Sequence, residues 1–314
     1  MKYVFGPVPS RRLGYSLGID VIPFKTCTLD CVYCQLGPTT VRTLERRQWV
    51  PENDIIEEIK DTLARHTGID YLTFSGSGEP TLHAGIGRII REIQAICAIP
   101  IAVITNGTLL FEQEVREGLM SADLVIPSVD CVSTKIFQRL NRPHPDLRME
   151  NILRGLETFS HDYSGALWVE IMIARGFNDT AEELECIAKK LERVRIDKIQ
   201  INTVTRPPSD TQIEPASREE LELARDILGE RAEIIGDFTK EKILFEETDI
   251  RQRILHLLQR HPDSARRISA ALGISMSIVE LHLRRLADEG KLQRIEHAGE
   301  QFYRPANTVG GGRQ

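Results

Sequence analysis

Three cysteines, Cys27, Cys31 and Cys34, stand close together with the spacing Cys-x3-Cys-x2-Cys. Their thiolates are soft ligands of the kind that iron–sulfur clusters select. A cluster of four irons bound by three thiolates leaves one iron without a protein ligand. Because an open iron can bind a small molecule, the spacing predicts a reactive metal centre rather than one that only carries electrons.

Zinc and disulfide bonds are the competing interpretations of these thiols. A structural zinc site normally takes four Cys or His ligands, often as two close pairs, and the sequence has no second pair of that kind. A disulfide framework does not suit a chain of 314 residues with six cysteines and no secretory signal. We expect Cys97, Cys131 and Cys186, which stand singly in apolar surroundings, to be buried small hydrophobic residues.

A glycine-rich segment, Gly76-Ser77-Gly78-Glu79, follows the second predicted strand. Glycines let the backbone approach a ligand, so that its carbonyl groups can accept hydrogen bonds from an ammonium. With the cysteine spacing, this segment resembles the radical S-adenosylmethionine (radical SAM) superfamily, whose members have Gly-Gly-Glu here. The resemblance implies a 4Fe–4S cluster on the three cysteines, with S-adenosylmethionine (SAM) on the open iron. It also implies an external one-electron donor of ferredoxin or flavodoxin type, and cleavage of SAM to a 5′-deoxyadenosyl radical.

The resemblance further implies which residues contact SAM. Tyr33 precedes the last cysteine, where the family carries an aromatic residue beside the adenine; a packing role is the alternative. Polar residues at strand ends would contact the ribose and the methionine carboxylate, with turn or capping roles as the alternative. These residues are Asn106, Ser128 and Asp130, followed at lower rank by Glu170 and Asn202.

Alternating strands and helices must position these residues. Apolar runs predict strands at 17–22, 71–75, 101–105, 124–128, 167–173 and 198–202. Amphipathic stretches predict helices at 51–66, 86–96, 112–120, 134–140, 148–159 and 181–194. Nearly apolar strands separated by helices indicate a parallel sheet, either open or closed into a barrel. The resemblance selects an α/β fold with a partial (β/α)6 radical SAM barrel, which we assign to residues 1–235.

The last part of the chain has a different pattern. We expect a linker at 236–248, a winged helix-turn-helix domain at 249–305 and a disordered, glycine-rich tail at 306–314. The domain should have helices at 249–260, 266–272 and 275–289, and a hairpin whose wing is 297–300. On the third helix, the apolar residues expected to face inward are Ile278, Val279, Leu281, Leu283 and Leu286.

Two further motifs bear on the substrate. The segment 6–14 (Gly-Pro-Val-Pro-Ser-Arg-Arg-Leu-Gly) and the segment 141–145 (Asn-Arg-Pro-His-Pro) resemble an Fe–S oxidoreductase family related to the tRNA wybutosine-synthesis enzymes. That relation implies RNA modification, with a peptide or protein substrate as the alternative. The remaining cysteines lack the spacing for the second cluster of the wybutosine enzymes. Arg11, Arg12 and Arg142 could bind a substrate carboxylate or phosphate, or form surface ion pairs.

Composition and charge leave several functions open. The net charge is −6, and no apolar run is long enough to span a bilayer, so we expect a cytoplasmic protein without a membrane partner. Phosphate contacts could come from Arg284, Arg285, Lys291 and Arg294, although acidic neighbours weaken the field. The winged helix therefore fits nucleic acid, a protein or peptide partner, or a purely structural role. A radical SAM enzyme is the leading hypothesis; a cluster-bearing redox or SAM sensor that binds DNA, and a zinc-stabilised scaffold, are the alternatives.

Overall fold

The computed structural model describes residues 2–235, 250–272, 274 and 276–306. Its contacts divide the chain into two compact units. The first unit comprises Met1–Val204 and Pro208–Phe238, and the C-terminal unit comprises Thr205–Pro207 and Thr239–Gln314. The expected linker at 236–248 lies outside the described residues, as does the expected tail apart from Ala306.

The first unit is built on an eight-stranded sheet in the order β1-β2-β5-β6-β7-β8-β9-β10. Strand β1 runs antiparallel to β2, and each later neighbour in the described sheet is parallel. The strands are β1 Val4–Ser10, β2 Gly14–Ile19, β5 Tyr71–Phe74, β6 Ile101–Thr105, β7 Leu124–Pro127, β8 Ala166–Ile173, β9 Lys198–Thr203 and β10 Ala232–Ile234. A separate pair, β3 Thr26–Cys27 and β4 Val41–Arg42, carries the first cysteine.

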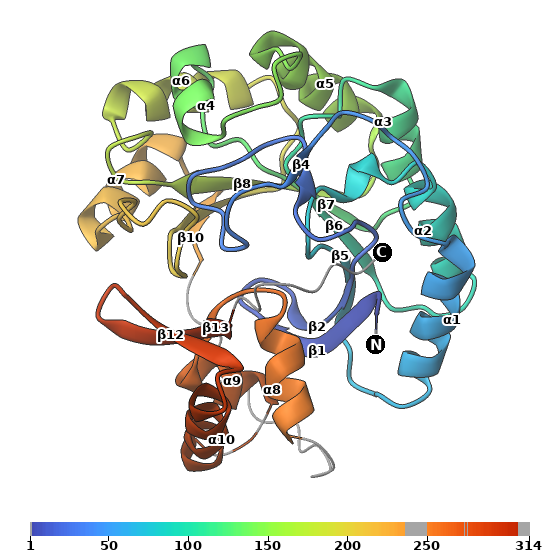
Figure 1. Cartoon of the computed structure of the whole chain (residues 1–314). Coiled ribbons are helices and arrows are strands. Elements are labelled where there is room, and N and C mark those ends of the chain that lie inside the picture. Colours follow the sequence, from blue (N-terminus) through green and yellow to red (C-terminus); the bar gives the residue numbers. More distant parts are fainter. Residues whose placement is uncertain (1, 236–249, 273, 275, 307–314) are drawn as a thin grey trace. The chain divides into compact units, whose positions relative to one another are not determined.

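Helices connect successive strands and lie along the outer side of the sheet (Figure 1). They are α1 Glu52–Leu63, the short 3-10 helix η1 Pro80–Leu82, α2 Ile86–Gln94, α3 Gln113–Leu119, α4 Thr134–Leu140, α5 Met149–Asp162, α6 Ala181–Leu191 and α7 Arg218–Leu228. From β2 to β9 each strand pairs with the next strand of the sheet along the chain. Right-handed crossovers between such neighbours place the helices on one face and leave the other face free for a site. The α/β fold expected from the sequence, with six βα units in chain order, is confirmed.

Alternation along the strands separates the two faces of the sheet. Leu17, Leu72, Val103 and Val169 are fully buried in the large core that the helices cover. On the concave face, Leu13 from the turn between β1 and β2 packs in a second cluster of buried residues, which also holds Ala102, Leu124 and Ile126. The β1–β2 turn therefore fills part of the concave face.

Strand β1 was missed by the sequence pattern. Its sequence contains Gly6, Pro7 and Pro9, which disfavour a central strand. At the edge of a sheet, however, an unpaired backbone face tolerates proline, and β1 is such an edge strand. The first predicted strand, 17–22, also starts too late and ends too late, because β2 spans Gly14–Ile19. Gly14 and Ser16 interrupt the apolar run at the beginning of β2, so the apolar pattern did not indicate where the strand starts.

The described residues of the C-terminal unit form three helices and a three-stranded sheet. The helices are α8 Ile250–Leu258, α9 Ala265–Leu272 and α10 Met276–Asp288. The sheet has the order β11-β13-β12, formed by Asp263–Ser264, Glu300–Pro305 and Leu292–His297. Strands β12 and β13 pair antiparallel around the expected wing. This arrangement is the winged helix-turn-helix that the sequence predicts.

The orientation of α10 corrects one part of that prediction. Val279, Leu283 and Leu286 are buried, as expected. Ile278 and Leu281 were expected to face inward, but they are 37% and 46% exposed. The physical reason is geometric: residues 279, 283 and 286 already form the one stripe of a helix that can face the core. Position 278 lies beside this stripe, and position 281 lies on the opposite side of the helix.

Among the described helices, none has both the length and the apolar character needed to cross a bilayer.

Candidate active site

The cysteine loop is attached to the glycine-rich segment by the backbone. Residues Thr26 and Gly78 form an isolated parallel bridge, and Glu79 N donates to Thr26 O at 3.1 Å. Lys25 N donates to Ser77 O at 2.6 Å. A Cβ at position 78 would lie 1.9 Å from Thr26 O, which is far inside contact distance. Glycine is therefore required at position 78 for the two segments to lie side by side.

The three thiols lie in a half-buried setting. Burial raises the pKa of Cys27 to about 12, and it also raises the pKa values of Cys31 and Cys34. They are consequently protonated thiols until a metal displaces the protons. Asn106 Nδ2 lies 3.4 Å from Cys27 Sγ, and Asn141 Nδ2 lies 3.4 Å from Cys31 Sγ, so two amides already face the sulfur atoms that a metal would make anionic.

This donor set fits a cluster better than a single metal ion. Within the described residues, no group of three or more His, Cys, Asp or Glu side chains converges enough to hold one ion. The thiolates of a 4Fe–4S cluster bind different irons at the corners of a cube, so they stand further apart than ligands of one ion. Three soft thiols with amide donors aimed at two of them suit that arrangement.

Glu79 acts as an internal brace and does not face an open space. Its carboxylate accepts hydrogen bonds from Thr81 N (3.0 Å), Thr81 Oγ1 (2.6 Å), Thr105 Oγ1 (2.6 Å) and Asn106 N (2.7 Å). Burial raises the pKa of Glu79, while these hydrogen bonds oppose the shift. Asn106, held in this way at the end of β6, also donates to Thr28 Oγ1 at 2.8 Å. The brace thus links the ends of β5 and β6 to the cysteine loop.

Gly76 and Ser77 lie against Asp20 at the end of β2. The Ser77 hydroxyl donates to Asp20 Oδ2, and both residues are buried. Gly76 has φ +132°, in the region that favours glycine, and a Cβ there would lie 2.9 Å from the Asp20 carboxyl carbon. The side chain of Ser77 is therefore engaged by Asp20.

A pocket brings four of the predicted SAM-binding residues together. Tyr33, Asn106, Ser128 and Asp130 line it, among apolar side chains from β7, α4 and α5. The Tyr33 hydroxyl donates to Asp130 Oδ2, and Met172 N donates to Asp130 Oδ1 at 3.0 Å. Burial raises the pKa of Tyr33 and of Asp130, and the neighbouring carboxylate raises that of Tyr33 further.

Glu170 and Asn202 belong to a separate polar network on the concave face. Arg12 donates to both carboxylate oxygens of Glu170, at 3.0 and 2.9 Å, and Asn202 Nδ2 donates to Glu170 Oε1 at 2.8 Å. Arg11 donates to Asn202 Oδ1 at 3.1 Å. Arg12 and Glu170 have side chains only 11% and 10% exposed. The alternative of a surface ion pair is therefore wrong for Arg12, because the β1–β2 turn carries this side chain inside the sheet.

The segment 141–145 and the isolated cysteines complete the comparison with the sequence. Arg142 forms an exposed ion pair with Asp210 at 3.2 Å, which is the second of its two predicted roles. Asn141 belongs to the 141–145 motif but was not predicted as a site residue, and its side chain contacts Cys31 and Asp130. The motif was the only feature of the sequence that could have pointed to this residue.

Among the isolated cysteines, Cys131 is buried as expected, but Cys97 is half-buried and Cys186 is exposed on α6. The prediction failed for Cys186 because α6 buries only the opposite stripe.

Comparison with known proteins identifies the first unit. The family model of the radical SAM superfamily matches residues 21–191, and that of bacterial regulatory proteins of the arsR family matches residues 248–291. The chain belongs to the radical SAM superfamily, whose members are enzymes that use a 4Fe–4S cluster and SAM. Within it, the chain is 37% identical over 310 residues to the UPF0026 protein MJ1312 of Methanocaldococcus jannaschii, covering 96% of each.

Two further similarities are less complete. The chain is 37% identical over 301 residues to the GTPase Obg of Brachyspira hyodysenteriae; this covers 93% of the chain but only 43% of that protein. Its fold resembles the crystal structure of a radical SAM methyltransferase from Sphaerobacter thermophilus, with a TM-score of 0.56 and 14% identity. That match covers 70% of this chain and 65% of the other. At such identity the likeness concerns the fold alone.

Proposed function

We propose that this radical SAM enzyme binds a 4Fe–4S cluster through Cys27, Cys31 and Cys34, and binds SAM in the adjoining pocket. The main support is the convergence of the cysteine loop with the polar ends of β5, β6 and β7 at one edge of the sheet. When bound, the cluster would pass one electron from an external ferredoxin- or flavodoxin-type donor to SAM. Cleavage of SAM would then supply a 5′-deoxyadenosyl radical, which abstracts a hydrogen atom from the substrate.

The chain's own residues would orient SAM and protect the reaction. In this proposal the Tyr33 ring lies beside the adenine, and Ser128, Asn106 and Asp130 contact the ribose or the methionine carboxylate. The backbone carbonyls at Gly76–Gly78 accept from the methionine ammonium, while Glu79 holds Asn106 in place. Apolar residues lining the pocket exclude water, which would otherwise compete for polar contacts.

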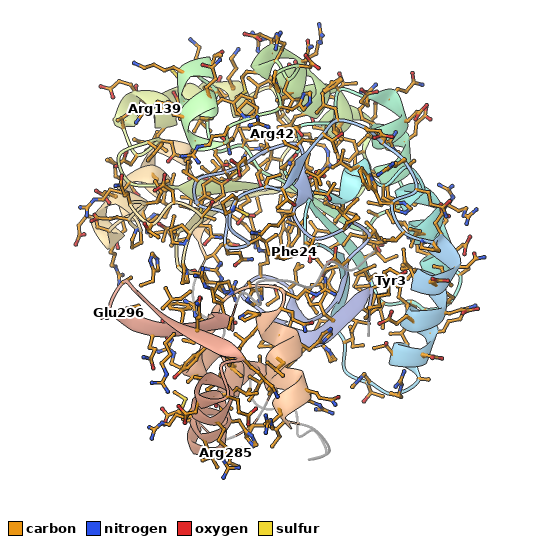
Figure 2. All side chains as sticks on the ribbon, in the orientation of Figure 1. Tyr3, Phe24, Arg42, Arg139, Arg285 and Glu296 are labelled. Atoms are coloured by element: carbon orange, nitrogen blue, oxygen red, sulfur yellow. The ribbon has the colours of Figure 1, made fainter. Side chains whose placement is uncertain are left out.

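RNA is the substrate class that we propose first. The arsR-type match supports a nucleic-acid role for the C-terminal unit, and Arg284 and Arg285 are exposed on α10. Figure 2 shows Arg285 on α10, pointing away from the other elements of that unit. Such arginines are suited to phosphate contacts, which give affinity without reading sequence. Modification of RNA by a hydrogen-abstracting enzyme would combine the two units in one activity.

A peptide or protein substrate is the second candidate, and a specific observation favours it. Ile278 and Leu281 are exposed on one side of α10, and Met276 is exposed at its start, on a helix where a nucleic-acid reader would present polar side chains. Of the proposed phosphate contacts, Lys291 pairs with Glu289 at 3.1 Å, which reduces the charge available for phosphate. An apolar helical face flanked by arginines suits an amphipathic peptide.

The experiment that tests the proposal measures SAM cleavage. The full-length protein is purified anaerobically, reconstituted with iron and sulfide, and incubated with dithionite and SAM, and 5′-deoxyadenosine is measured by mass spectrometry. We expect the product with the native sequence and with Cys186→Ala, because that thiol lies exposed on α6. Cys31→Ala should abolish the product, because it removes one of three cluster ligands.

The absorbance of the same samples separates the competing functions. Cys31→Ala should also lose the brown cluster chromophore; retention of a full cluster would exclude the ligand assignment. A well-formed cluster that cleaves no SAM with either dithionite or a reduced flavodoxin would favour the sensor hypothesis. A colourless protein that retains zinc after reconstitution would overturn the cluster altogether.

A further inference from the structure

The segment 140–144 lies alongside the cysteine loop and holds its backbone. Four backbone hydrogen bonds join them: Val32 N to Leu140 O (2.9 Å), Asp30 N to Asn141 O (2.9 Å) and to Arg142 O (3.2 Å), and His144 N to Thr28 O (2.9 Å). Leu29 and Pro143 add an isolated antiparallel bridge. Because these contacts are made by backbone atoms, they persist when a side chain in the segment is changed. The position of the loop can therefore be separated experimentally from the role of the Asn141 side chain.

The Asn141 side chain faces a cysteine sulfur and is almost fully buried, with 3% exposed. Its Nδ2 lies 3.4 Å from Cys31 Sγ, 2.9 Å from Asp130 Oδ2 and 3.2 Å from the Tyr33 hydroxyl. Its Oδ1 accepts from the Cys131 thiol at 3.6 Å. The carboxylate of Asp130 can only accept, so it fixes the amide with its N–H groups on the side of Cys31.

An amide donor aimed at a ligating thiolate has a defined electrostatic effect. It stabilises negative charge on sulfur, and the reduced state of a cluster carries one more negative charge than the oxidised state. Hydrogen bonds to cluster sulfurs are accordingly among the factors that set reduction potential, making reduction easier when a donor is present. The same amide also contacts Tyr33 and Asp130, two proposed SAM-binding residues.

We propose that Asn141 is a positioning residue of the metal centre, which raises the reduction potential of the cluster through its hydrogen bond to Cys31. The proposal rests on the proposed function, because it requires a cluster on the three cysteines. It assigns a role to the 141–145 motif: the backbone of the segment holds the loop, and its first side chain tunes the metal centre.

The test compares two buried asparagines that both contact Asp130. Asn178, also fully buried, donates to the backbone oxygens of Asp130 (2.7 Å) and Met172 (2.8 Å), with no contact to a cluster cysteine among the bonds described for it. The midpoint potential of the reconstituted full-length protein is measured by redox titration monitored by electron paramagnetic resonance. We expect a more negative potential for Asn141→Ala, and a potential equal to that of the native sequence for Asn178→Ala.

The outcomes separate this inference from the proposed function. An unshifted potential in Asn141→Ala, or an equal shift in Asn178→Ala, overturns the role of Asn141 and leaves the proposed function intact. If Asn141→Ala does not assemble a cluster, Asn141→Ser is titrated instead, and an unshifted potential there overturns the role equally. Absence of a 4Fe–4S signal from the native sequence would overturn the proposed function itself.

Discussion

The ion pair between Arg12 and Glu170 is the most buried charge pair described in the first unit. Burial alone would raise the pKa of Glu170, but the Arg12 guanidinium beside it and their hydrogen bonds bring the pKa below its ordinary value of 4.5. Asn202 Nδ2 also donates a hydrogen bond to the Glu170 carboxylate, so this carboxylate has two partners. Removing one partner of such a pair leaves a buried charge uncompensated.

We therefore predict that Glu170→Gln lowers the free energy of unfolding at pH 7 by about 3 kcal/mol. Because the folded-state pKa is depressed, the stabilisation from Glu170 is present above about pH 4.5 and is lost as the pH falls through the folded-state value. The difference between native sequence and variant should thus shrink towards pH 3. Urea unfolding of both proteins at several pH values measures it. A difference that stays constant over this range would contradict the assignment.

At the scale of elements, α5 packs against the chain that follows β6 with almost no space between them. A Cβ at Gly155 of α5 would lie 2.3 Å from Phe111 N and 2.5 Å from Leu110 C. Both are backbone atoms, which cannot rotate away as a side chain can. On α3, by contrast, a Cβ at Gly118 would find its nearest atom at 3.6 Å, an ordinary contact.

This contrast predicts opposite effects of the same substitution. Alanine is favoured over glycine inside a helix by about 1 kcal/mol, so Gly118→Ala should be neutral or stabilising. Gly155→Ala should instead lower the free energy of unfolding by about 1–3 kcal/mol, because overpacking outweighs helix propensity. Chemical denaturation of the two variants measures both values. Equal effects of the two changes would show that α5 can move away from residues 110–111.

The sequence predicted the elements that have strong periodicity, and failed where tertiary contacts decide. The six central strands and their helices are apolar and regular, so their order was predictable. Strand β1 was missed because its edge position, not its composition, permits Pro7 and Pro9. Ile278 and Leu281 were misassigned because an apolar residue does not reveal whether a partner covers it.

The same division applies to the candidate site. The cysteines and the glycine-rich segment carry spacing that the sequence displays directly. The bonds from Arg12 to Glu170 and from Asn141 to Cys31 join residues that are 158 and 110 positions apart. No local pattern signals such pairs, since only the folded sheet brings them together. Nor does the sequence show that the side chains of Ser77 and Glu79 bond to Asp20, Thr81 and Thr105, while the contact of this segment with a cofactor stays a prediction.

At the scale of the whole molecule, an RNA substrate must overcome the net charge of −6. Binding should therefore depend on the few exposed cations of the C-terminal unit, and should weaken steeply with salt because each phosphate contact releases counterions. We predict that Arg284→Ala with Arg285→Ala reduces the slope of log affinity against log salt by about 1–2. Fluorescence anisotropy with a labelled transfer RNA, at several potassium chloride concentrations, measures the slope.

A matched control replaces two paired arginines of the first unit, because Arg284 also has a partner, Glu280 at 3.9 Å. Arg218→Ala with Arg225→Ala removes the same number of positive charges from α7, where the side chains pair with Glu222 and Asp226. The slope should then stay close to that of the native sequence, because the proposed phosphate contacts are on α10. Salt-independent binding, or an equal loss in both double variants, would exclude RNA contact through α10. The exposed apolar residues of α10 would then identify the peptide as the better candidate.

The distance in sequence between the cysteine loop and its supporting residues has a consequence for biosynthesis. Cys31 leaves the ribosome 110 residues before Asn141, and Cys27 precedes Asn106 by 79. At about 5–20 residues per second, the thiols wait about 5–20 seconds before the segment that holds their loop exists. During that interval they are unprotected and open to oxidation. For the proposed cluster, we therefore expect iron delivery to follow translation of α4 and Asn141, which makes metal loading an event of the folded chain rather than of the nascent one.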